Sequence, residues 1–436
     1  MKYYSTNKKA ESATLAEAVV NGIASDRGLY MPEKIKKLPD NFFTNIDKMS
    51  FVEIACAVAE AFFDEDINKQ ELDGIVKDTL SFDCPIVHVV DNIYCLELFH
   101  GPTLAFKDVG ARFMARLLRH YVKTNRGKII NVLVATSGDT GSAVANGFLN
   151  VDGIHVYVLY PQGKVSKIQE CQFTTLGHNI TALEVDGVFD DCQALVKDAF
   201  LDKDIHCHMK LTSANSINVA RFLPQAFYYF NAYARMKAIN KNDNLVISVP
   251  SGNFGNITAG LFAKEMGLPI KRFIAANNAN DVFYKYLKTG QYAPKASIQT
   301  LANAMDVGDP SNFARIIDLY HGNHDKITSI ISGASYSDGQ ILDTIKNCYN
   351  STGYILDPHG ACGFQALKDN LNINENGVFL ETAHPAKFKE TVESAICKEI
   401  EIPQRLQNFM GGEKKTIKIS KSFKDFKDFL LSQCNA

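Results

Sequence analysis

One lysine of this sequence stands where its amine could act as a nucleophile. Lys107 follows the apolar residues 104–106 and precedes Asp108, where we predict that a helix begins. The positive end of a helix dipole repels an ammonium group, and partial burial also disfavours the charged form. Both effects favour the neutral amine, which is the nucleophile of Schiff-base chemistry. The ordinary alternatives are a lysine that reaches solvent or one that pairs with Asp108, and the local sequence alone favours these.

A short loop after the apolar run Ile129–Ala135 offers a place for an anion. Residues 136–142 read Thr-Ser-Gly-Asp-Thr-Gly-Ser and lead into a helical pattern. Glycines let the backbone approach a ligand closely, and the first N–H groups of a helix suit a carboxylate. For this loop taken alone, an ordinary capped turn is an equally good interpretation.

A second loop, after the run Leu245–Val249, has the composition of a phosphate cradle. It reads Pro-Ser-Gly-Asn-Phe-Gly-Asn over residues 250–256, and a helical pattern starts at once. A helix dipole behind glycines and polar groups favours a phosphate, although a capped turn is again the alternative. The loop lacks the Lys-Ser/Thr of a Walker A motif and the G-x-G of a dinucleotide fingerprint. It therefore indicates a phosphate but no nucleotide.

A third loop, residues 381–388, follows the run Val378–Leu380 and places the hydroxyl of Thr382 at a strand end. None of these features is decisive alone, and a cap or turn explains this one too. Pyridoxal phosphate needs all of them together: a lysine for its aldehyde, a cradle for its phosphate, a partner for its ring nitrogen and an anion site for the amino-acid carboxylate. The combination predicts an enzyme that carries this cofactor on Lys107 and holds its phosphate in the loop Ser251–Asn256.

The elements around these loops follow two patterns along the chain. The first ninety or so residues read as mostly helical, with helices predicted at Phe51–Phe63 and from about Asn68 to Leu80. From about residue 93, short apolar runs alternate with helical patterns, which indicates parallel sheets covered on both faces, with ligands at the carboxyl ends of strands. The other apolar runs are His155–Tyr160, Ile180–Val185 and Phe273–Ala276. The helical patterns are Val109–Tyr121, Val165–Leu176, Asp190–Phe200 and Asn256–Met266.

Composition argues against several classes of protein. The chain has 436 residues, enough for two or three domains, and its net charge is 46 − 48 = −2, so we expect no nucleic-acid partner. The N-terminus lacks the apolar core of a signal peptide, and no stretch reaches the roughly 18 apolar residues of a membrane span. The ten cysteines form no C-x-x-C, and His206 and His208 lack a third ligand. We therefore expect a cytoplasmic protein with reduced thiols, no metal and no membrane partner.

Five segments, in order, resemble the threonine synthases. They are LELFHGPTLAFKD (96–108), ATSGDTG (135–141), SANSIN (213–218), SVPSGNFGN (248–256) and TAHPAKF (382–388). The likeness runs from about residue 28 to about residue 388, to the longer form of the family with an extra N-terminal helical domain. It implies a tryptophan-synthase-like, fold type II pyridoxal-phosphate enzyme of α/β class with two lobes of mostly parallel sheet. We place the helical domain at 1–92, the smaller lobe with Lys107 at 93–240, with some segments crossing between lobes, and the larger lobe at 241–436.

The resemblance also implies roles for single residues. Lys107 would bind the cofactor's aldehyde and carry protons, and Thr382 would face the ring nitrogen as a neutral hydroxyl. The cofactor phosphate would be bound by Gly252, Asn253, Phe254, Gly255 and Asn256. The substrate carboxylate and the ring edge would be held by Ser137, Asp139 and Thr140. Many fold type II enzymes have Asn in place of Asp139, but the longer threonine synthases share the Asp.

For the phosphate of the substrate, the candidates are Asn215, Ser216, Asn218, Arg221, His384 and Lys387. The alternative for Arg221 is an ion pair on a helix surface, and for Lys387 it is a solvated side chain. Both alternatives stay open on the sequence, because neither residue stands in a pattern that fixes its partner.

The implied reaction converts O-phospho-L-homoserine and water to L-threonine and phosphate, as the last step of threonine biosynthesis. It is a β,γ-elimination and replacement, carried out by a pyridoxal-phosphate-dependent carbon–oxygen lyase acting on phosphates. The expected partner is this small-molecule substrate, and the enzyme would be a monomer or a homodimer. The nearest alternative is a phospho-lyase or a serine/threonine dehydratase of the same fold, which releases a keto acid. A non-catalytic binder of a phosphorylated metabolite is the other alternative, and Lys107 argues against it.

Overall fold

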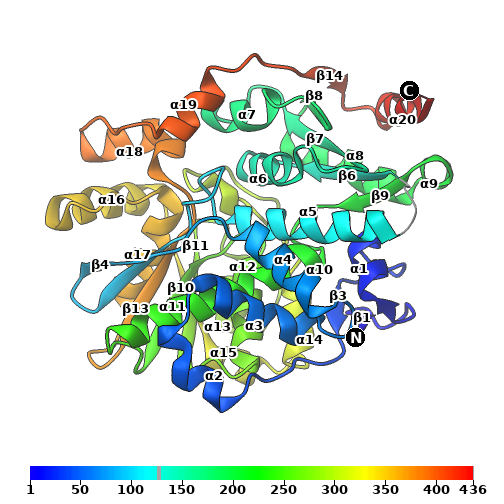
Figure 1. Ribbon diagram of the computed structural model, residues 1–436. Coiled ribbons are helices and arrows are strands. Elements are labelled where there is room, and N and C mark those ends of the chain that lie inside the picture. Colours follow the sequence, from blue (N-terminus) through cyan, green and yellow to red (C-terminus); the bar gives the residue numbers. More distant parts are fainter. Residues whose placement is uncertain (125–128, 436) are drawn as a thin grey trace. The chain divides into compact units, whose positions relative to one another are not determined.

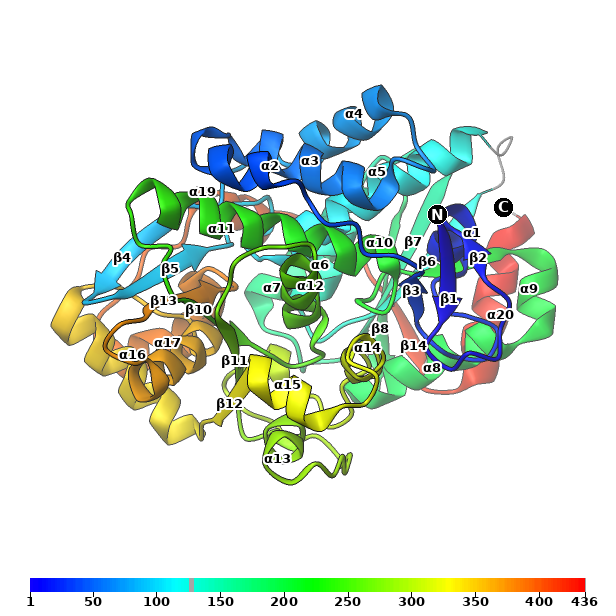
Figure 2. The same cartoon turned by 90° about the horizontal axis from the view of Figure 1, so that it is seen from below.

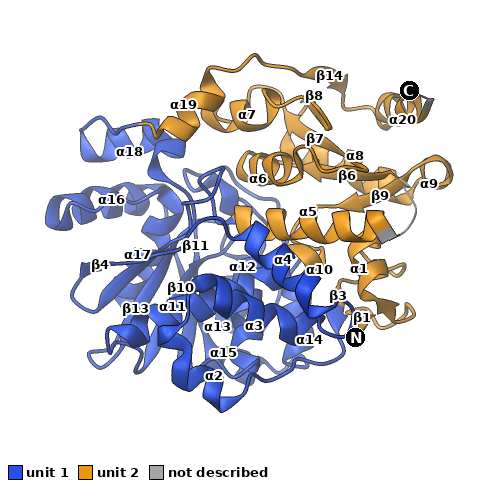
Figure 3. Cartoon of the chain, viewed as in Figure 1, with its two compact units in different colours: residues 1, 31–106, 222–401 blue, residues 2–30, 107–221, 402–436 orange. Residues whose placement is uncertain are grey.

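The computed structural model describes residues 1–124 and 129–435, and its contacts divide the chain into two compact units (Figures 1 and 3). Unit 1 consists of residue 1, residues 31–106 and residues 222–401, and unit 2 of residues 2–30, 107–221 and 402–436. Each unit therefore combines segments that are far apart in the sequence. The unit boundaries lie elsewhere than the predicted boundaries at 92/93 and 240/241, and those ranges stay a prediction for the domains.

Unit 1 is built on a six-stranded sheet in the order β12-β11-β10-β13-β5-β4. Neighbouring strands are parallel, except that β4 runs antiparallel to β5. The strands are β4 (Ile86–Val90), β5 (Ile93–Glu97), β10 (Leu245–Pro250), β11 (Arg272–Asn277), β12 (Ile331–Ser335) and β13 (Asn376–Glu381). The predicted runs that begin at residues 245, 273 and 378 are confirmed as β10, β11 and β13. Every residue of β10 is buried, as expected for a strand covered on both faces.

Helices lie on both faces of this sheet (Figure 2). A Cβ added to Gly260 of α12 (Gly255–Glu265) would lie 2.8 Å from the Phe273 ring, so α12 packs on that face. A Cβ added to Gly363 of α17 (Pro358–Asn370) would lie 3.3 Å from Phe379 Cβ. In the strand register Phe273 is level with Val378, the neighbour of Phe379, so the two phenylalanines point to opposite faces. The helix pattern predicted from Asn256 is therefore confirmed, and α12 begins directly behind the second loop.

The N-terminal part of unit 1 is helical, as predicted. α3 spans Phe51–Phe63, and Ser50 and Glu53 start it with a reciprocal capping box. α4 spans Lys69–Thr79 and is capped by Asn68. The other helices of unit 1 are α2 (Asp40–Asn45), α11 (Ala226–Ala238), α13 (Val282–Thr289), α14 (Phe313–Leu319), α15 (His324–Ile330), α16 (Asp338–Thr352) and α18 (Lys389–Ile396). Short 3-10 helices occur at Ile46–Lys48, Leu223–Gln225, Asn303–Met305 (η3) and Pro385–Phe388 (η4).

Unit 2 contains a five-stranded, fully parallel sheet in the order β14-β8-β7-β6-β9. Its strands are β6 (Ile130–Ala135), β7 (Ile154–Pro161), β8 (Ile180–Asp186), β9 (Lys210–Ser213) and β14 (Ile417–Ser420). Its helices are α5 (Lys107–Thr124), α6 (Asp139–Phe148), α7 (Lys167–Thr174), α8 (Phe189–Leu201), α9 (Lys203–His208), α10 (Val219–Phe222), α19 (Gln404–Met410) and α20 (Phe423–Ser432). The predicted strands and helices of this region are confirmed to within a few residues. Over the residues that the structure describes, no helix combines the length and apolar content needed to cross a bilayer.

The first thirty residues differ from the helical expectation. They form β1 (Lys2–Ser5), β2 (Ala13–Thr14) and α1 (Leu15–Asn21), and β3 (Tyr30–Pro32) lies beside β1 where the chain leaves unit 2. The buried amide of Asn218 donates a hydrogen bond to Val19 O of α1 at 2.8 Å. This segment is therefore attached to unit 2 through the same stretch of chain, residues 213–218, that the family resemblance singled out.

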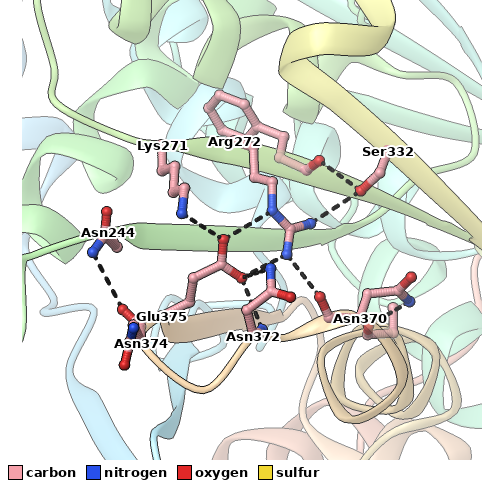
Figure 4. Close-up of polar contacts among 10 residues, drawn as sticks. Asn244, Lys271, Arg272, Ser332, Asn370, Asn372, Asn374 and Glu375 are labelled. Carbon is pink, nitrogen blue, oxygen red and sulfur yellow. Dashed lines mark hydrogen bonds and ion pairs between the residues drawn. The ribbon is translucent and has the colours of Figure 1, made fainter.

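An ion-pair cluster around the buried Glu375 joins the amino ends of β11 and β13 (Figure 4). Glu375, which is 1% exposed, accepts from Arg272 Nη2 at 2.7 Å and lies 3.1 Å from Lys271 Nζ. Its Oε2 also accepts from the backbone N and Nδ2 of Asn372, at 2.9 and 3.0 Å. Burial alone would raise the pKa of Glu375, but the hydrogen bonds from Arg272, Asn372 and Lys271 outweigh it and lower the pKa to about 2. The cluster lies at the edge of the sheet opposite the loops that follow the strands, so it serves stability.

Candidate active site

The loop Ser251–Asn256 is held in place from two sides within unit 1. Ser251 donates its backbone N–H to Ala276 O at 2.9 Å and accepts from Asn277 Nδ2 at 2.8 Å. Asn253 O accepts from Asn312 Nδ2 at 3.0 Å, and Asn253 Oδ1 accepts from Ser311 N at 2.7 Å. The loop is thus fixed to the end of β11 and to the segment that precedes α14.

The loop also has the shape of an anion cradle. Phe254 adopts a left-handed conformation with φ +60° and precedes α12, whose first turn is capped by no side chain. The N–H groups of that turn are therefore available to an anion. A Cβ on Gly252 would lie 2.6 Å from Met305 Cα and 3.0 Å from Ala304 O, so only glycine fits between the loop and η3.

A buried amide donor of this loop lacks an acceptor. Asn256 Oδ1 accepts from the hydroxyls of Tyr228 and Tyr229, each at 2.6 Å, which fixes the orientation of the amide. Its Nδ2 is buried and has no hydrogen-bond partner among the described residues. A buried donor left without a partner costs about 1–3 kcal/mol. Together with the uncapped helix, this donor fits the phosphate of the predicted cofactor.

The loop 251–256 is linked to a buried cationic side chain, Arg315. Arg315 of α14 is fully buried, and its Nη1 donates to Asn312 Oδ1 at 2.6 Å. Its guanidinium carbon lies 4.1 Å from the ring centroid of Phe222. Burial lowers the pKa of Arg315 to about 9, so the group stays cationic at neutral pH. Asn312 also donates a hydrogen bond to the Asn253 carbonyl, so the side chain of Asn312 links the guanidinium group of Arg315 to the loop.

Thr382 lies at the carboxyl end of β13, the strand next to β10 in the unit 1 sheet. The Thr382 carbonyl accepts from Phe106 N at 2.9 Å, and Ala383 forms an antiparallel bridge with Ala105. Thr382 is 6% exposed. The structure therefore brings Thr382 and the loop 251–256 to one edge of one sheet, as predicted from their positions after strands. Lys107 is the next residue in the chain after Phe106.

His384 is the N-cap residue of η4, Lys387 lies within η4, and both make contacts within unit 1. His384 Nδ1 accepts from Ala386 N at 3.1 Å, and burial lowers the pKa of His384 to about 4, so the ring is neutral with its proton on Nε2. Lys387 is 1% exposed, and its Nζ donates to Thr103 O at 2.9 Å. The solvated alternative for Lys387 is therefore wrong, because its amine holds the backbone four residues before Lys107.

In unit 2, Lys107 is the first residue of α5, one residue before the predicted helix start. Its side chain is half-buried and the neighbouring Asp108 is buried. The Lys107 carbonyl accepts from Arg221 Nη1 at 3.1 Å, and Arg221 Nε donates to Ala214 O at 2.7 Å. Burial lowers the pKa of Arg221 to about 10, while the charge of Asp108 acts to raise it. The surface-pair alternative for Arg221 is wrong: it is 4% exposed and ties the start of α5 to residue 214.

The loop after β6 is shaped by Thr136 and Gln169. Thr136 Oγ1 accepts from the backbone N–H groups of Gly138 and Gly141 at 2.9 and 2.8 Å. Gly138 has φ +146°, and a Cβ there would lie 2.5 Å from the Gln169 amide. That amide donates to Asp139 Oδ1 at 2.8 Å, which uses one oxygen of the buried carboxylate. Ser137 and Thr140 on either side are half-buried.

The segment after β9 completes the predicted residues of unit 2. β9 pairs with β6, so residues 213–218 and the loop 136–142 follow neighbouring parallel strands. Asn215 and Ser216 are half-buried. The Asn218 amide is fully buried and bonds Val19 O, Ser213 O and Ala220 N, so its contacts are those of a residue that fixes the segment.

Several polar residues near these loops were not predicted. They are Tyr228, Tyr229, Asn312, Arg315, Asp357, His359 and Glu381. Asp357-Pro358 is a recognisable helix start, and it indeed begins α17, but nothing in the local sequence shows that its carboxylate is buried beside Glu381. The role of the other residues depends on contacts across long sequence distances.

Comparison with known proteins gives three family matches along the chain. The family described as "Threonine synthase N terminus" matches residues 2–80, "Pyridoxal-phosphate dependent enzyme" matches residues 84–380, and "Threonine synthase, C-terminal" matches residues 360–430. A threonine synthase from Haemophilus influenzae is 47% identical over 406 residues, which are 93% of this chain and 94% of the relative.

Two solved structures agree with this result. The crystal structure of threonine synthase from Escherichia coli has a TM-score of 0.92 and 41% identity, over 99% of this chain and all of that one. The structure of "PLP bound Threonine synthase" from Brucella melitensis has a TM-score of 0.93 and 34% identity, and the match covers both chains completely. At these identities the likeness extends to the family as well as the fold.

Proposed function

The chain belongs to the threonine synthase family of pyridoxal-phosphate-dependent enzymes, and we propose how its own residues carry out the reaction. The reaction converts O-phospho-L-homoserine and water to L-threonine and phosphate. The relatives that match nearly the whole chain are named threonine synthases, which favours this reaction over the phospho-lyase and the dehydratase. The observation that carries the assignment of the cofactor's phosphate is the buried Asn256 Nδ2, which has no hydrogen-bond partner among the described residues and belongs to the first turn of α12, where no side-chain cap is found.

Pyridoxal phosphate, when bound, supplies an electron-accepting ring that takes up the charge left at the substrate's α-carbon. The backbone N–H groups of residues 252–256 and Asn256 Nδ2 would hold its phosphate, with Arg315 as the buried positive charge behind them. The hydroxyl of Thr382 would meet the ring nitrogen and place no charge there. None of these contacts offers a carboxylate to the phosphate, so the donors suit an anion.

Lys107 is proposed as the residue that binds the cofactor's aldehyde and moves protons. Its position as the first residue of α5 favours a neutral amine, because the N-terminus of a helix carries a partial positive charge. Nζ would then take the α-proton of the substrate and return it at the end of the reaction. Between these transfers the β-carbon would lose a proton and phosphate would leave the γ-carbon. The γ-carbon would then gain a proton to become the methyl group, and water would add at the β-carbon. Arg221 fixes the Lys107 backbone through its bond to the carbonyl.

The substrate's carboxylate is proposed to bind at the start of α6. The N-cap residue Gly138 makes no side-chain cap, and Thr136 Oγ1 accepts only the N–H of Gly141 in the first turn. The other N–H groups of that turn and the hydroxyls of Ser137 and Thr140 are therefore proposed to bind the carboxylate. Asp139 Oδ1 accepts a hydrogen bond from Gln169 Nε2. This bond partly neutralises the negative charge of Asp139 and so reduces its repulsion of the substrate's carboxylate. The assignment requires the loop shape that Gly138 allows.

For the substrate's phosphate, the contacts separate the candidates into two groups. Asn215, Ser216 and His384 are half-buried and are proposed to touch it, with His384 donating from a neutral Nε2. The amides and cations of Asn218, Arg221 and Lys387 bond backbone carbonyls, so we propose that they position neighbouring segments.

The test is phosphate release from O-phospho-L-homoserine, with the amino-acid product identified, for the wild type, Lys107→Ala and Lys167→Ala. Lys167 is the matched control, because it is also the first residue of a helix in unit 2 but is exposed. Threonine and phosphate in equal amounts, lost in Lys107→Ala and retained in Lys167→Ala, are expected. A keto acid as the product would instead assign the chain to the lyases, and full activity of Lys107→Ala would remove the lysine from the mechanism.

A further inference from the structure

The carboxyl groups of Asp357 and Glu381 are buried close to each other next to Thr382. Glu381 is the last residue of β13 and precedes Thr382, and Asp357 is the N-cap residue of α17. Both side chains are fully buried. The Asp357 backbone N–H donates to Glu381 Oε1 at 2.5 Å, which places the two carboxyl groups at the same helix start. Neither residue has a role in the mechanism described above.

The two carboxyl groups receive very different numbers of hydrogen bonds. Asp357 Oδ1 accepts from the backbone N of His359 at 2.6 Å and from its Nδ1 at 2.5 Å, and Oδ2 accepts from Ala383 N at 3.4 Å. Glu381 Oε2 has no hydrogen-bond partner among the described residues. It packs closely against Gly360, where an added Cβ would lie 1.6 Å from Oε2. Because two adjacent buried carboxylates cannot both stay ionised, the proton belongs on the group with fewer donors, which is Glu381.

The tautomer of His359 supports this assignment. His359 Nε2 accepts from Ala304 N at 3.2 Å, so its proton is on Nδ1, which donates to Asp357. An ionised carboxylate accepts a hydrogen bond from a neutral histidine more strongly than a carboxylic acid does. The bond from His359 Nδ1 therefore favours an ionised Asp357. Burial and then the charge of Asp357 raise the pKa of Glu381 well above its usual range. The other titratable groups that interact with the pair are Cys95, Glu97, Tyr354, Cys362 and His384.

These contacts form a continuous path between two parts of the proposed cofactor site. Asp357 holds Ala383, the residue after Thr382, and through His359 it holds Ala304. Ala304 O and Met305 form the wall against which Gly252 packs. A change in the charge of the pair would therefore move both the turn with Thr382 and the wall of the phosphate loop.

We propose that Asp357 and Glu381 share a single proton, carried by Glu381, and act as positioning residues that set Thr382 and the Ala304 wall relative to each other within unit 1. This rests on the proposed roles of Thr382 and of the loop 251–256 in binding the cofactor. The proton sharing itself is a property of the folded chain and can be measured without cofactor.

The first experiment follows the thermal midpoint of the apoprotein from pH 5 to pH 9 for the wild type and Glu381→Gln. Glu381 has a folded-state pKa above its unfolded value, so its protonation stabilises the fold at low pH, and this stabilisation is lost as the pH rises through the folded-state pKa. Gln keeps the neutral shape and does not titrate. We expect the midpoint of Glu381→Gln to rise relative to the wild type as the pH increases. A difference that does not change with pH would overturn the proton sharing.

The second experiment titrates the same apoproteins, together with Asp357→Asn and His359→Gln, with pyridoxal phosphate and follows its absorbance. Glu381→Gln should bind within about threefold of the wild type, because an amide replaces a protonated acid. Asp357→Asn replaces one of the two acceptor oxygens by an NH2 donor, so at least one of the three N–H groups that bond Asp357 loses its acceptor, and His359→Gln loses the link to Ala304. Both variants should therefore bind at least tenfold more weakly. His359→Gln decides the positioning role if Asp357→Asn does not fold. Wild-type affinity in the variant that folds would overturn the positioning role. A wild-type protein that binds no pyridoxal phosphate would contradict the proposed function, and the thermal midpoints would then be the test of whether Glu381 carries the shared proton.

Discussion

Replacing Gly252 by alanine tests whether the loop 251–256 holds the cofactor's phosphate. The added Cβ would lie 2.6 Å from Met305 Cα and 3.0 Å from Ala304 O. Both neighbours are backbone atoms, so no side chain can rotate away. Since Asn253 is bonded to Ser311 and to Asn312, the loop cannot shift without straining those bonds. The substitution therefore displaces the loop from η3 and leaves the sheet intact.

The expected size of the effect follows from these contacts. Forcing an extra methyl group into a packed place costs about 1–3 kcal/mol of stability. If the loop moves instead and one hydrogen bond to a charged phosphate is lost, the cost is about 1.5–3 kcal/mol of binding. The second figure corresponds to a dissociation constant for pyridoxal phosphate that is roughly 10- to 150-fold larger. The assay is absorbance titration of the apoprotein, with the thermal midpoint measured in parallel.

Gly339→Ala is the matched control for this experiment. Gly339 lies in α16 of the same unit, and a Cβ there would meet nothing within 4 Å. Alanine in an exposed helix position should leave cofactor affinity unchanged and raise stability by about 0.5–1 kcal/mol. If Gly252→Ala folds and binds pyridoxal phosphate within twofold of the wild type, the loop does not hold the phosphate, and the reasoning from its geometry is refuted.

Three further perturbations have definite expected outcomes. Asn256→Ala should fold, because Tyr228 OH keeps Gln225 Oε1 at 3.1 Å, and should weaken cofactor binding about 10- to 100-fold in the same titration; unchanged affinity would contradict the role of Nδ2. Glu375→Gln should lower the free energy of unfolding by about 3 kcal/mol at pH 7, because the folded-state pKa of about 2 lies below the unfolded value near 4.5. This loss should be smaller in urea unfolding at pH 3, because the contribution of the ionised Glu375 to wild-type stability decreases as the pH falls toward its folded-state pKa. An equal loss at both pH values would refute the ion-pair origin. His384→Asn should leave the pH profile of kcat/KM unchanged between pH 5 and 7, because burial keeps His384 neutral down to about pH 4, whereas loss of an ionisation near pH 6 would show that His384 titrates there.

Much of the local structure could be predicted because it depends on neighbours in the sequence. The apolar runs and helical patterns located β6, β7, β8, β10, β11 and β13 and the helices between them to within a few residues. Lys107 at a helix start, Thr382 at a strand end and the loop at Gly252 follow from the same local signals. Short-range hydrogen bonding and the alternation of buried side chains operate over a few residues, so a single sequence carries that information.

The assembly of the two units could not be predicted in this way. Residues 2–30 belong with residues 107–221, and residues 31–106 with residues 222–401, although a reading along the chain places the divisions near residues 92 and 240. The attachment of the first segment depends on Asn218, whose amide reaches Val19 over a sequence separation of 199. Such contacts depend on which surfaces pack, and the local sequence does not encode that.

The state of the buried polar groups also depends on packing alone. In the sequence, Asp357 reads as a helix cap, and Arg221 and Lys387 read as ordinary charged residues. In the folded chain, Arg221 bonds the Lys107 carbonyl within unit 2, Lys387 bonds the Thr103 carbonyl within unit 1, and the Asp357 N–H bonds the buried Glu381 carboxyl group. Residue type and spacing establish which chemistry this chain can perform. Burial, which sets the energy of each charge and the orientation of each amide, arises only when distant segments pack together.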